Sequence, residues 1–161
     1  MAEDNFKPQL RIVALDYGKR RIGVAVSDIL RITAQPHQTL VVRDISDAVD
    51  QVKDLMLELN AERIVLGLPK NLSGSLGEMG KEVQTFGLLL SNAIQVPVEF
   101  VDERLTSVQA EKTMHFLNEK PSKNKGKVDS LSAIFILQTF LEMEKNANSE
   151  DISIDDENPD S

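Results

Sequence analysis

Three carboxylates stand where side chains often meet a ligand. Asp16 ends the apolar run of residues 10–16, Glu103 follows the apolar run of residues 98–102, and Asp129 opens the last segment with an apolar pattern. A carboxylate at the end of a buried strand costs free energy unless a cation or donor meets it. Each acid alone has an ordinary explanation, as a turn cap or as a charge at a helix N-terminus. Together they form an all-oxygen set that suits Mg²⁺ or Mn²⁺ and leaves water positions for a substrate phosphate.

Other site chemistries find little support in the residue types. The chain has no cysteine, which excludes a thiolate metal site or thiol nucleophile and agrees with a reducing compartment. Its two histidines, His37 and His115, lie in unrelated segments, so a zinc site is disfavoured. Neither histidine is near a serine motif, which disfavours a Ser-His-Asp hydrolase.

Basic residues accompany each of the three acids. They are Lys19, Arg20 and Arg21 after the first, Arg104 after the second, and Lys120, Lys123, Lys125 and Lys127 before the third. Binding of a nucleic-acid backbone needs basic loops of this kind around an acidic centre. Solvated loop charge would explain each cluster separately but not their shared association with acids. We therefore interpret these residues as nucleic-acid-binding.

The segment from Gly67 to Gly74 is a Gly- and Pro-containing loop that follows an apolar run. It lacks the spacing of a P-loop. Contact of Lys70 and the loop amides with a phosphate is one interpretation, and a plain strand-to-helix turn is the other.

The net charge of −8 over 161 residues argues at first against a nucleic-acid partner. Of the 26 acids, however, six fall in residues 146–161, which hold no Lys or Arg, and the remaining 20 nearly balance the 18 Lys and Arg. No run approaches the ~20 apolar residues of a membrane span. The polar first ten residues predict no secretory signal, and we expect a cytoplasmic protein.

The apolar patterns predict five strands and four helices. Strands are expected at residues 10–16, 21–28, 33–42, 63–67 and 98–102, with Pro36 placing the third at a sheet edge. Helices are expected at residues 45–59 with Asp44 as N-cap, at residues 76–94, from Thr106 in a capping-box pattern, and at residues 128–145.

This order predicts an α/β fold in one domain. We expect a five-stranded mixed sheet, its first three strands antiparallel and its last two parallel, with helices on both faces. The domain should span residues 10–145. A flexible arm of residues 1–9 and an acidic disordered tail of residues 146–161 should flank it.

Four ordered segments resemble the YqgF family of RNase H-like proteins. The segments are LDYGKRRIGVAVSD at residues 15–28, GLP at residues 67–69, DERLTS at residues 102–107, and DSLSA followed by ILQ within residues 129–138. The resemblance runs from about Leu10 to Leu141. Members of the family are described as nucleases that mature the 5′ end of 16S ribosomal RNA and as Holliday-junction resolvases.

The resemblance implies an RNase H-like fold, a divalent-metal site at Asp16, Glu103 and Asp129, cytoplasmic location and a role in ribosome biogenesis. It departs from resolvase relatives, which usually place an acid after the fourth strand, where this chain has Gly67-Leu68-Pro69. Glu103 must therefore reach further in from the fifth strand. Ser130 and Ser132 replace small apolar residues, a mild change.

The expected chemistry is in-line hydrolysis of a phosphodiester with two Mg²⁺ or Mn²⁺ ions ~4 Å apart. Structured RNA such as the 16S precursor is the expected substrate, and branched DNA is the alternative. Two other functions stay open: a nucleotide-binding module of the actin and sugar-kinase type, for which 161 residues lack a second lobe, and a non-catalytic nucleic-acid-binding module, which would tend to lose the acids.

Overall fold

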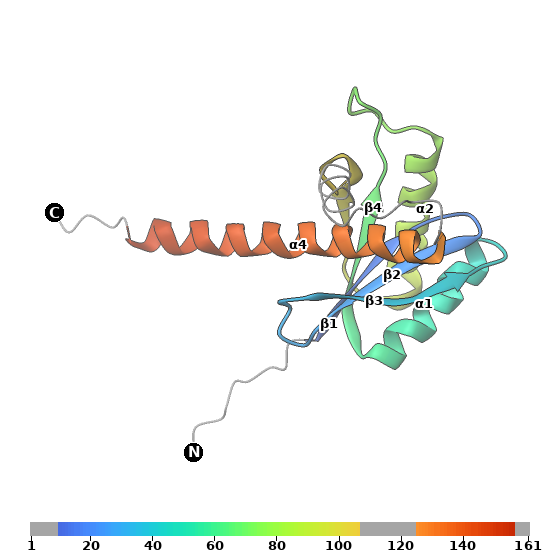
Figure 1. The fold of residues 1–161 in the computed structure, drawn as a ribbon, viewed down its shortest axis with the longest axis horizontal. Helices are drawn as coiled ribbons and strands as arrows, with labels where there is room; N and C mark the ends of the chain where they lie inside the picture. The colour runs from blue at the N-terminus through green and yellow to red at the C-terminus, as the bar shows by residue number, and fades with distance from the viewer. Residues whose placement is uncertain (1–9, 107–124, 157–161) are drawn as a thin grey trace, which may run out of the picture.

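The computed structural model describes residues 10–106 and 125–156, with the side chains of the second range from Ser130 to Ser149. Its strands are β1 (Arg11–Asp16), β2 (Arg21–Ser27), β3 (Ala34–Val41), β4 (Ala61–Leu68) and β5 (Val98–Asp102). Its long helices are α1 (Ile45–Leu59), α2 (Glu78–Ile94) and α4 (Lys125–Asp156), as labelled in Figure 1.

The five strands form one mixed sheet in the order β3-β2-β1-β4-β5. β1, β2 and β3 are antiparallel neighbours, whereas β4 and β5 run parallel to β1. Both the strand directions and the edge position predicted for the strand containing Pro36 are confirmed. In this arrangement β1, β4 and β5 end at the same edge of the sheet, which we call the carboxyl edge.

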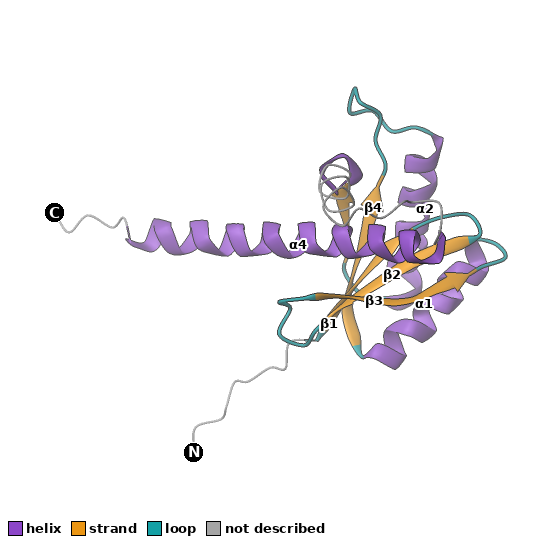
Figure 2. Ribbon diagram, viewed as in Figure 1, coloured by secondary structure: helices purple, strands orange, loops and turns teal. Residues whose placement is uncertain are grey.

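Alternate residues of the central strands face two separate cores, because successive side chains on a strand point to opposite faces. Val13 and Leu15 of β1 pack with α1 and α2, while Ile12 and Ala14 pack with Ala133 and three other residues of α4. The sheet therefore lies between α1 and α2 on one face and α4 on the other (Figure 2).

Local signals in the sequence explain where α1 begins. Asp44 has extended backbone, and its side chain accepts a hydrogen bond from the Asp47 N–H at 2.8 Å. A side-chain oxygen at this position satisfies one of the N–H groups that a first helical turn leaves unpaired. The predicted N-cap is confirmed.

The helix predicted to start at Thr106 begins earlier, since residues 103–106 are already helical. The Asp102 carboxylate accepts the Arg104 N–H at 2.9 Å and so acts as the cap. The Thr106 hydroxyl instead donates to the Glu103 carbonyl at 2.9 Å, inside the first turn. The rest of the capping-box pattern, together with His115 and Lys120, lies outside the described residues.

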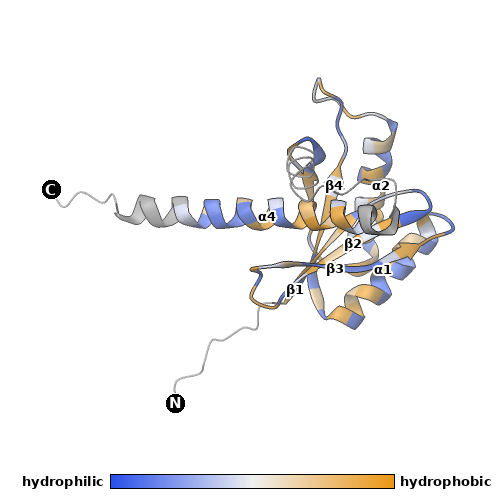
Figure 3. Cartoon of the chain, in the orientation of Figure 1, coloured by the Kyte–Doolittle hydropathy of each residue, from blue (hydrophilic) through white to orange (hydrophobic). Residues whose placement is uncertain are grey.

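Helix α4 is longer than the sequence pattern predicts, continuing past residue 145 to Asp156. The reason is that no glycine or proline interrupts the chain between Gly126 and Pro159. Its apolar part lies over the sheet, and its polar part extends beyond it (Figure 3). Arg63 of β4 contacts both the apolar and the polar part of α4. Its guanidinium lies 5.7 Å from the centre of the Phe140 ring and pairs with Glu144 at 2.5 Å.

Removal of residues 146–161 should leave stability almost unchanged. The described side chains of this segment, residues 146–149, are all exposed, so their removal exposes little apolar surface. We expect the melting temperature of the truncated protein to stay within about 2 °C of that of the full chain, measured by calorimetry. A drop of about 10 °C would show that this end of α4 packs on the domain.

Within residues 10–106 and 125–156, every helix is too short or too polar to cross a lipid bilayer.

Candidate active site

Asp16 and Glu103 meet at the carboxyl edge of the sheet. Asp16 is the last residue of β1, and Glu103 directly follows β5. β4 lies between these two strands. The Asp16 and Glu103 side chains nevertheless hydrogen-bond to each other. We call these two residues the carboxylate pair.

Gly67 of β4 makes room for this contact. A Cβ atom at position 67 would lie 2.7 Å from Glu103 Oε1 and 2.5 Å from the Ile136 Cδ1 atom of α4. Both distances are shorter than atoms tolerate without moving. Gly67 pairs with Val101 of β5, and its neighbour Leu66 pairs with Leu15 of β1. The Glu103 side chain thus passes over the β4 backbone, beneath α4, to reach Asp16.

Burial raises the pKa of the Glu103 carboxyl above its ordinary value. The hydrogen bond with Asp16 acts in the opposite direction, and the negative charge of Asp102 raises this pKa further. Two carboxyl groups in direct contact cannot both stay ionised cheaply without a proton or a cation between them. The carboxylate pair therefore has the properties of a site that attracts a cation.

Asp102 and Glu103 have different partners although they are adjacent. Arg104 Nη2 and Nε donate to Asp102 Oδ2 at 2.6 and 3.0 Å. Lys70 Nζ lies 4.0 Å from the same oxygen. These contacts lower the pKa of Asp102, chiefly through the Arg104 hydrogen bonds. Asp102 thus brings Lys70 and Arg104 together, and we call these two residues the cation pair.

From the sequence alone, Asp102 is only a possible charge at a helix N-terminus. In the structure Asp102 caps the helix, whereas Glu103 belongs to the carboxylate pair. The structural role therefore holds for Asp102 and the site role for Glu103. Glu103 lies one residue past the end of β5, and the alternation of side chains along this strand, continued by one residue, sends Asp102 and Glu103 to opposite faces.

A second group missed by sequence reasoning fixes the chain just after Asp16. The Tyr17 hydroxyl donates to Glu82 Oε1 of α2 at 2.7 Å, and Lys19 Nζ lies 3.8 Å from Glu82 Oε2. The Tyr17 ring packs on Phe86, with ring centres 4.7 Å apart. Burial and the Glu82 contact raise the pKa of Tyr17, so this hydroxyl stays protonated. Lys19 thus pairs with Glu82 and does not join the cation pair.

The remaining predicted site residues fall in three groups. Arg20 and Arg21 are exposed in and after the turn between β1 and β2. The first turns of α4 contain Lys125, Lys127 and Asp129, whose side chains are not among those described. Lys123 lies outside the described residues. Asp129 stands one turn before Ala133, which α4 buries against the sheet. Among the described side chains, no cluster of three or more metal-binding residues occurs.

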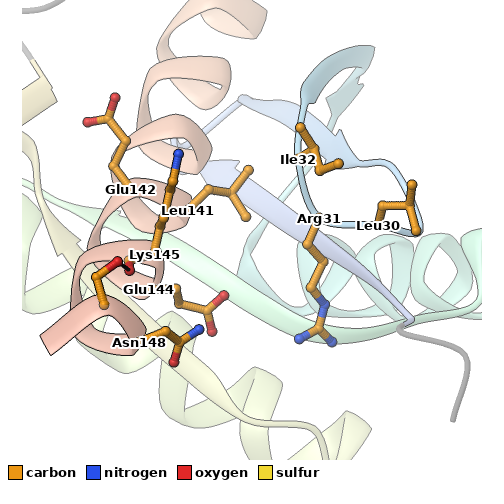
Figure 4. Close-up of a pocket in the computed structure, with 9 residues that line it drawn as sticks. Leu30, Arg31, Ile32, Leu141, Glu142, Glu144, Lys145 and Asn148 are labelled. Carbon is orange, nitrogen blue, oxygen red and sulfur yellow. Dashed lines mark hydrogen bonds between the residues drawn. The ribbon is translucent and has the colours of Figure 1, made fainter. Parts of the chain in front are cut away.

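A groove of about 730 Å³ lies away from the carboxylate pair, between the turn joining β2 to β3 and the later part of α4 (Figure 4). Arg31 borders it and donates to the carbonyl of Leu10, just before β1 begins. The groove is therefore near the opposite end of β1 from Asp16. Arg31 is also paired with Glu62, so its charge is already neutralised.

Comparison with known proteins identifies relatives along most of the chain. A protein from Synechococcus sp. is 41% identical over 138 residues, which cover 86% of this chain and 93% of the relative. One from Natranaerobius thermophilus is 39% identical over 139 residues, covering 86% and 99%. Both are provisionally named pre-16S rRNA nucleases.

Solved structures show the same fold. T. thermophilus RuvC in complex with a Holliday junction substrate superposes with a TM-score of 0.58 at 12% identity, covering 84% of this chain and 96% of that one.

The family model of RuvX, described as Holliday junction resolvase, matches residues 10–143. This range includes both members of the carboxylate pair and Asp129. The chain belongs to the RuvX family, as its resemblance to YqgF proteins predicts.

Proposed function

We propose that this chain is a metal-dependent endonuclease that hydrolyses phosphodiester bonds in structured RNA during maturation of the 5′ end of 16S ribosomal RNA. The observation that carries the proposal is the carboxylate pair, which the fold assembles over Gly67 from two separate strands. The names of the relatives support the RNA substrate.

The residues at the carboxylate pair fit a divalent cation. Their donors are all carboxylate oxygens, the ligands that Mg²⁺ and Mn²⁺ prefer. Burial raises the pKa of Glu103, so metal binding there would release protons and strengthen as pH rises. We place Asp129 as the third ligand, because it lies one helical turn before Ala133 at the start of α4.

The protein's own contribution is to hold the metal ions and to position the substrate. Asp16 is fixed by β1 in the middle of the sheet, and Tyr17 anchors the following turn through Glu82. The cation pair would hold a backbone phosphate near the reaction centre. Two bound Mg²⁺ or Mn²⁺ ions, held by Asp16, Glu103 and Asp129, would supply Lewis acidity for the phosphate and lower the pKa of the attacking water.

A second substrate, a four-way DNA junction, is favoured by the description of the RuvX family. The two candidates are separated by one experiment. Purified protein with Mg²⁺ or Mn²⁺ is given a 16S precursor fragment or a four-way junction, and initial rates of cleavage are compared. Faster cleavage of the RNA supports the proposal. Cleavage of the junction alone would assign the chain to DNA, and cleavage of neither would reject the nuclease function.

The basic segment before Asp129 should bind substrate without taking part in the reaction. Replacing Lys123, Lys125 and Lys127 together by Ala should weaken RNA binding. It should flatten the slope of log affinity against log salt by about 0.7 to 0.9 for each phosphate that the variant no longer binds. Turnover at saturating RNA should change much less. Lys53→Ala, on the exposed side of α1, is the control. If the triple variant binds RNA as the wild type does, these lysines are solvated charges that do not bind RNA.

A further inference from the structure

The loop between β4 and α2, residues 69–77, projects beyond the carboxyl edge of the sheet (Figure 2). Hydrogen bonds within the loop close its tip. The Asn71 N–H donates to the Ser75 carbonyl at 2.9 Å, and the Gly74 N–H donates to the Asn71 carbonyl at 2.8 Å. The Asn71 side-chain amide also donates to Ser75 Oγ at 3.1 Å. The tip is therefore a turn built by its own backbone and polar side chains.

Leu72 stands at this tip and is 98% exposed. Single exposed leucines are common and by themselves need no explanation. This leucine, however, sits in a closed turn between Asn71 and Ser73, whose side chains hydrogen-bond to Ser75. The turn thus presents one apolar side chain to solvent, away from either core.

Two cationic side chains lie along the same loop. Lys70 lies within the loop and approaches Asp102. Arg104 Nη1 lies 3.6 Å from the place that a Cβ atom on Gly74 would take. Gly67, over which Glu103 meets Asp16, is only a few residues earlier on β4. The apolar tip and Lys70 therefore belong to the loop that follows Gly67, and Glu103 and Arg104 approach this strand and loop from the end of β5.

We propose that Leu72 is an apolar wedge that packs on the last base pair of an RNA stem, beside the unpaired strand that is cut. The inference rests on the proposed function. Apolar side chains inserted at base steps are an established means of opening stacked nucleic acid, and proteins recognise RNA chiefly where its bases are unstacked. The cation pair beside the loop would hold the phosphates next to the wedge.

The test compares two RNA substrates that share the sequence around the cut, one with a stem ending beside the cut and one fully unpaired. We expect Leu72→Ser to lower kcat/KM about tenfold on the stem substrate, the equivalent of about 1.4 kcal/mol of apolar packing. The unpaired substrate should be cleaved as before. Leu72→Met should keep the preference for the stem. Leu57→Ser is the matched control, because Leu57 of α1 is also exposed, at 74%.

A binding experiment separates this inference from the proposed function. 2-Aminopurine in the last base pair of the stem brightens when the unpaired base stacked on it is displaced, and the Asp16→Asn background is expected to prevent cleavage. A fluorescence rise that disappears with Leu72→Ser supports the wedge even if wild-type protein cleaves neither RNA. Equal rises with Leu and Ser at position 72 would overturn it, as would an equal loss of cleavage on both substrates.

Discussion

Gly67→Ala should abolish most of the activity while leaving the fold intact. The added Cβ would lie 2.7 Å from Glu103 Oε1, so the glutamate cannot keep its place over β4. A displacement of about 1 Å at a reacting group can cost about a hundredfold in rate. We expect a loss of that size in kcat, measured with the 16S precursor fragment. The clash with Ile136 should also cost about 1 to 3 kcal/mol of stability.

The two effects can be separated with a second substitution. Ile136→Val removes Cδ1, the atom that would lie 2.5 Å from the new Cβ. Combined with Gly67→Ala, it should restore much of the lost stability but none of the activity, because Glu103 remains displaced. Gly77→Ala is the control, since a Cβ there comes no closer than 3.6 Å to its neighbours. Recovery of activity together with stability in the double variant would show that Glu103 does not need its place over Gly67.

Asp16→Asn should fold, bind RNA and lose metal-dependent cleavage. The amide keeps the shape of the side chain but removes one of the two charges that attract the cation. We expect cleavage to fall about a thousandfold, or about 4 kcal/mol in the barrier. Because RNA binding depends on the basic loops, its affinity and salt dependence should change little.

Thermal unfolding gives a second measure of the Asp16→Asn effect. Mg²⁺ should raise the melting temperature of the wild type, because a ligand that binds only the folded state stabilises it. The shift should be nearly absent in the variant. Without metal the variant should be at least as stable as the wild type, since the contact between two acids is relieved. Asp54→Asn on the exposed side of α1 should leave all these properties unchanged. Wild-type cleavage by Asp16→Asn would reject Asp16 as a metal ligand.

The sequence predicts much of this architecture because its signals are local. Asp44 caps α1 as its type and position indicate. The order of apolar runs predicts the sheet, and the short β1–β2 turn makes those strands antiparallel neighbours. The placement of Asp16 and Glu103 at strand ends follows from the same runs. Parallel strands that end at one edge bring the two acids near each other, but their contact also needs the space that Gly67 leaves.

What sequence reasoning did not predict depends on contacts between distant residues. Gly67 is predicted as the last residue of a strand, but nothing in the sequence indicates that it provides the space in which Glu103 lies. Glu82 carried no signal, because its partner Tyr17 is far away in the chain. The acidic composition after residue 145 predicts an earlier end for α4, whereas the helix continues to Asp156 because no glycine or proline interrupts it.

The passage of Glu103 over Gly67 has a consequence for how such sites diverge. The site needs an acid at one point above β4, and the strand that carries the acid can differ. An acid at position 67 combined with a small residue at position 103 would place a carboxylate at the same point. An acid at position 67 alone would put two carboxylates there, and a small residue at position 103 alone would leave none. The two positions should therefore covary among relatives as one inherited unit, which a search for an acid at a fixed strand would overlook.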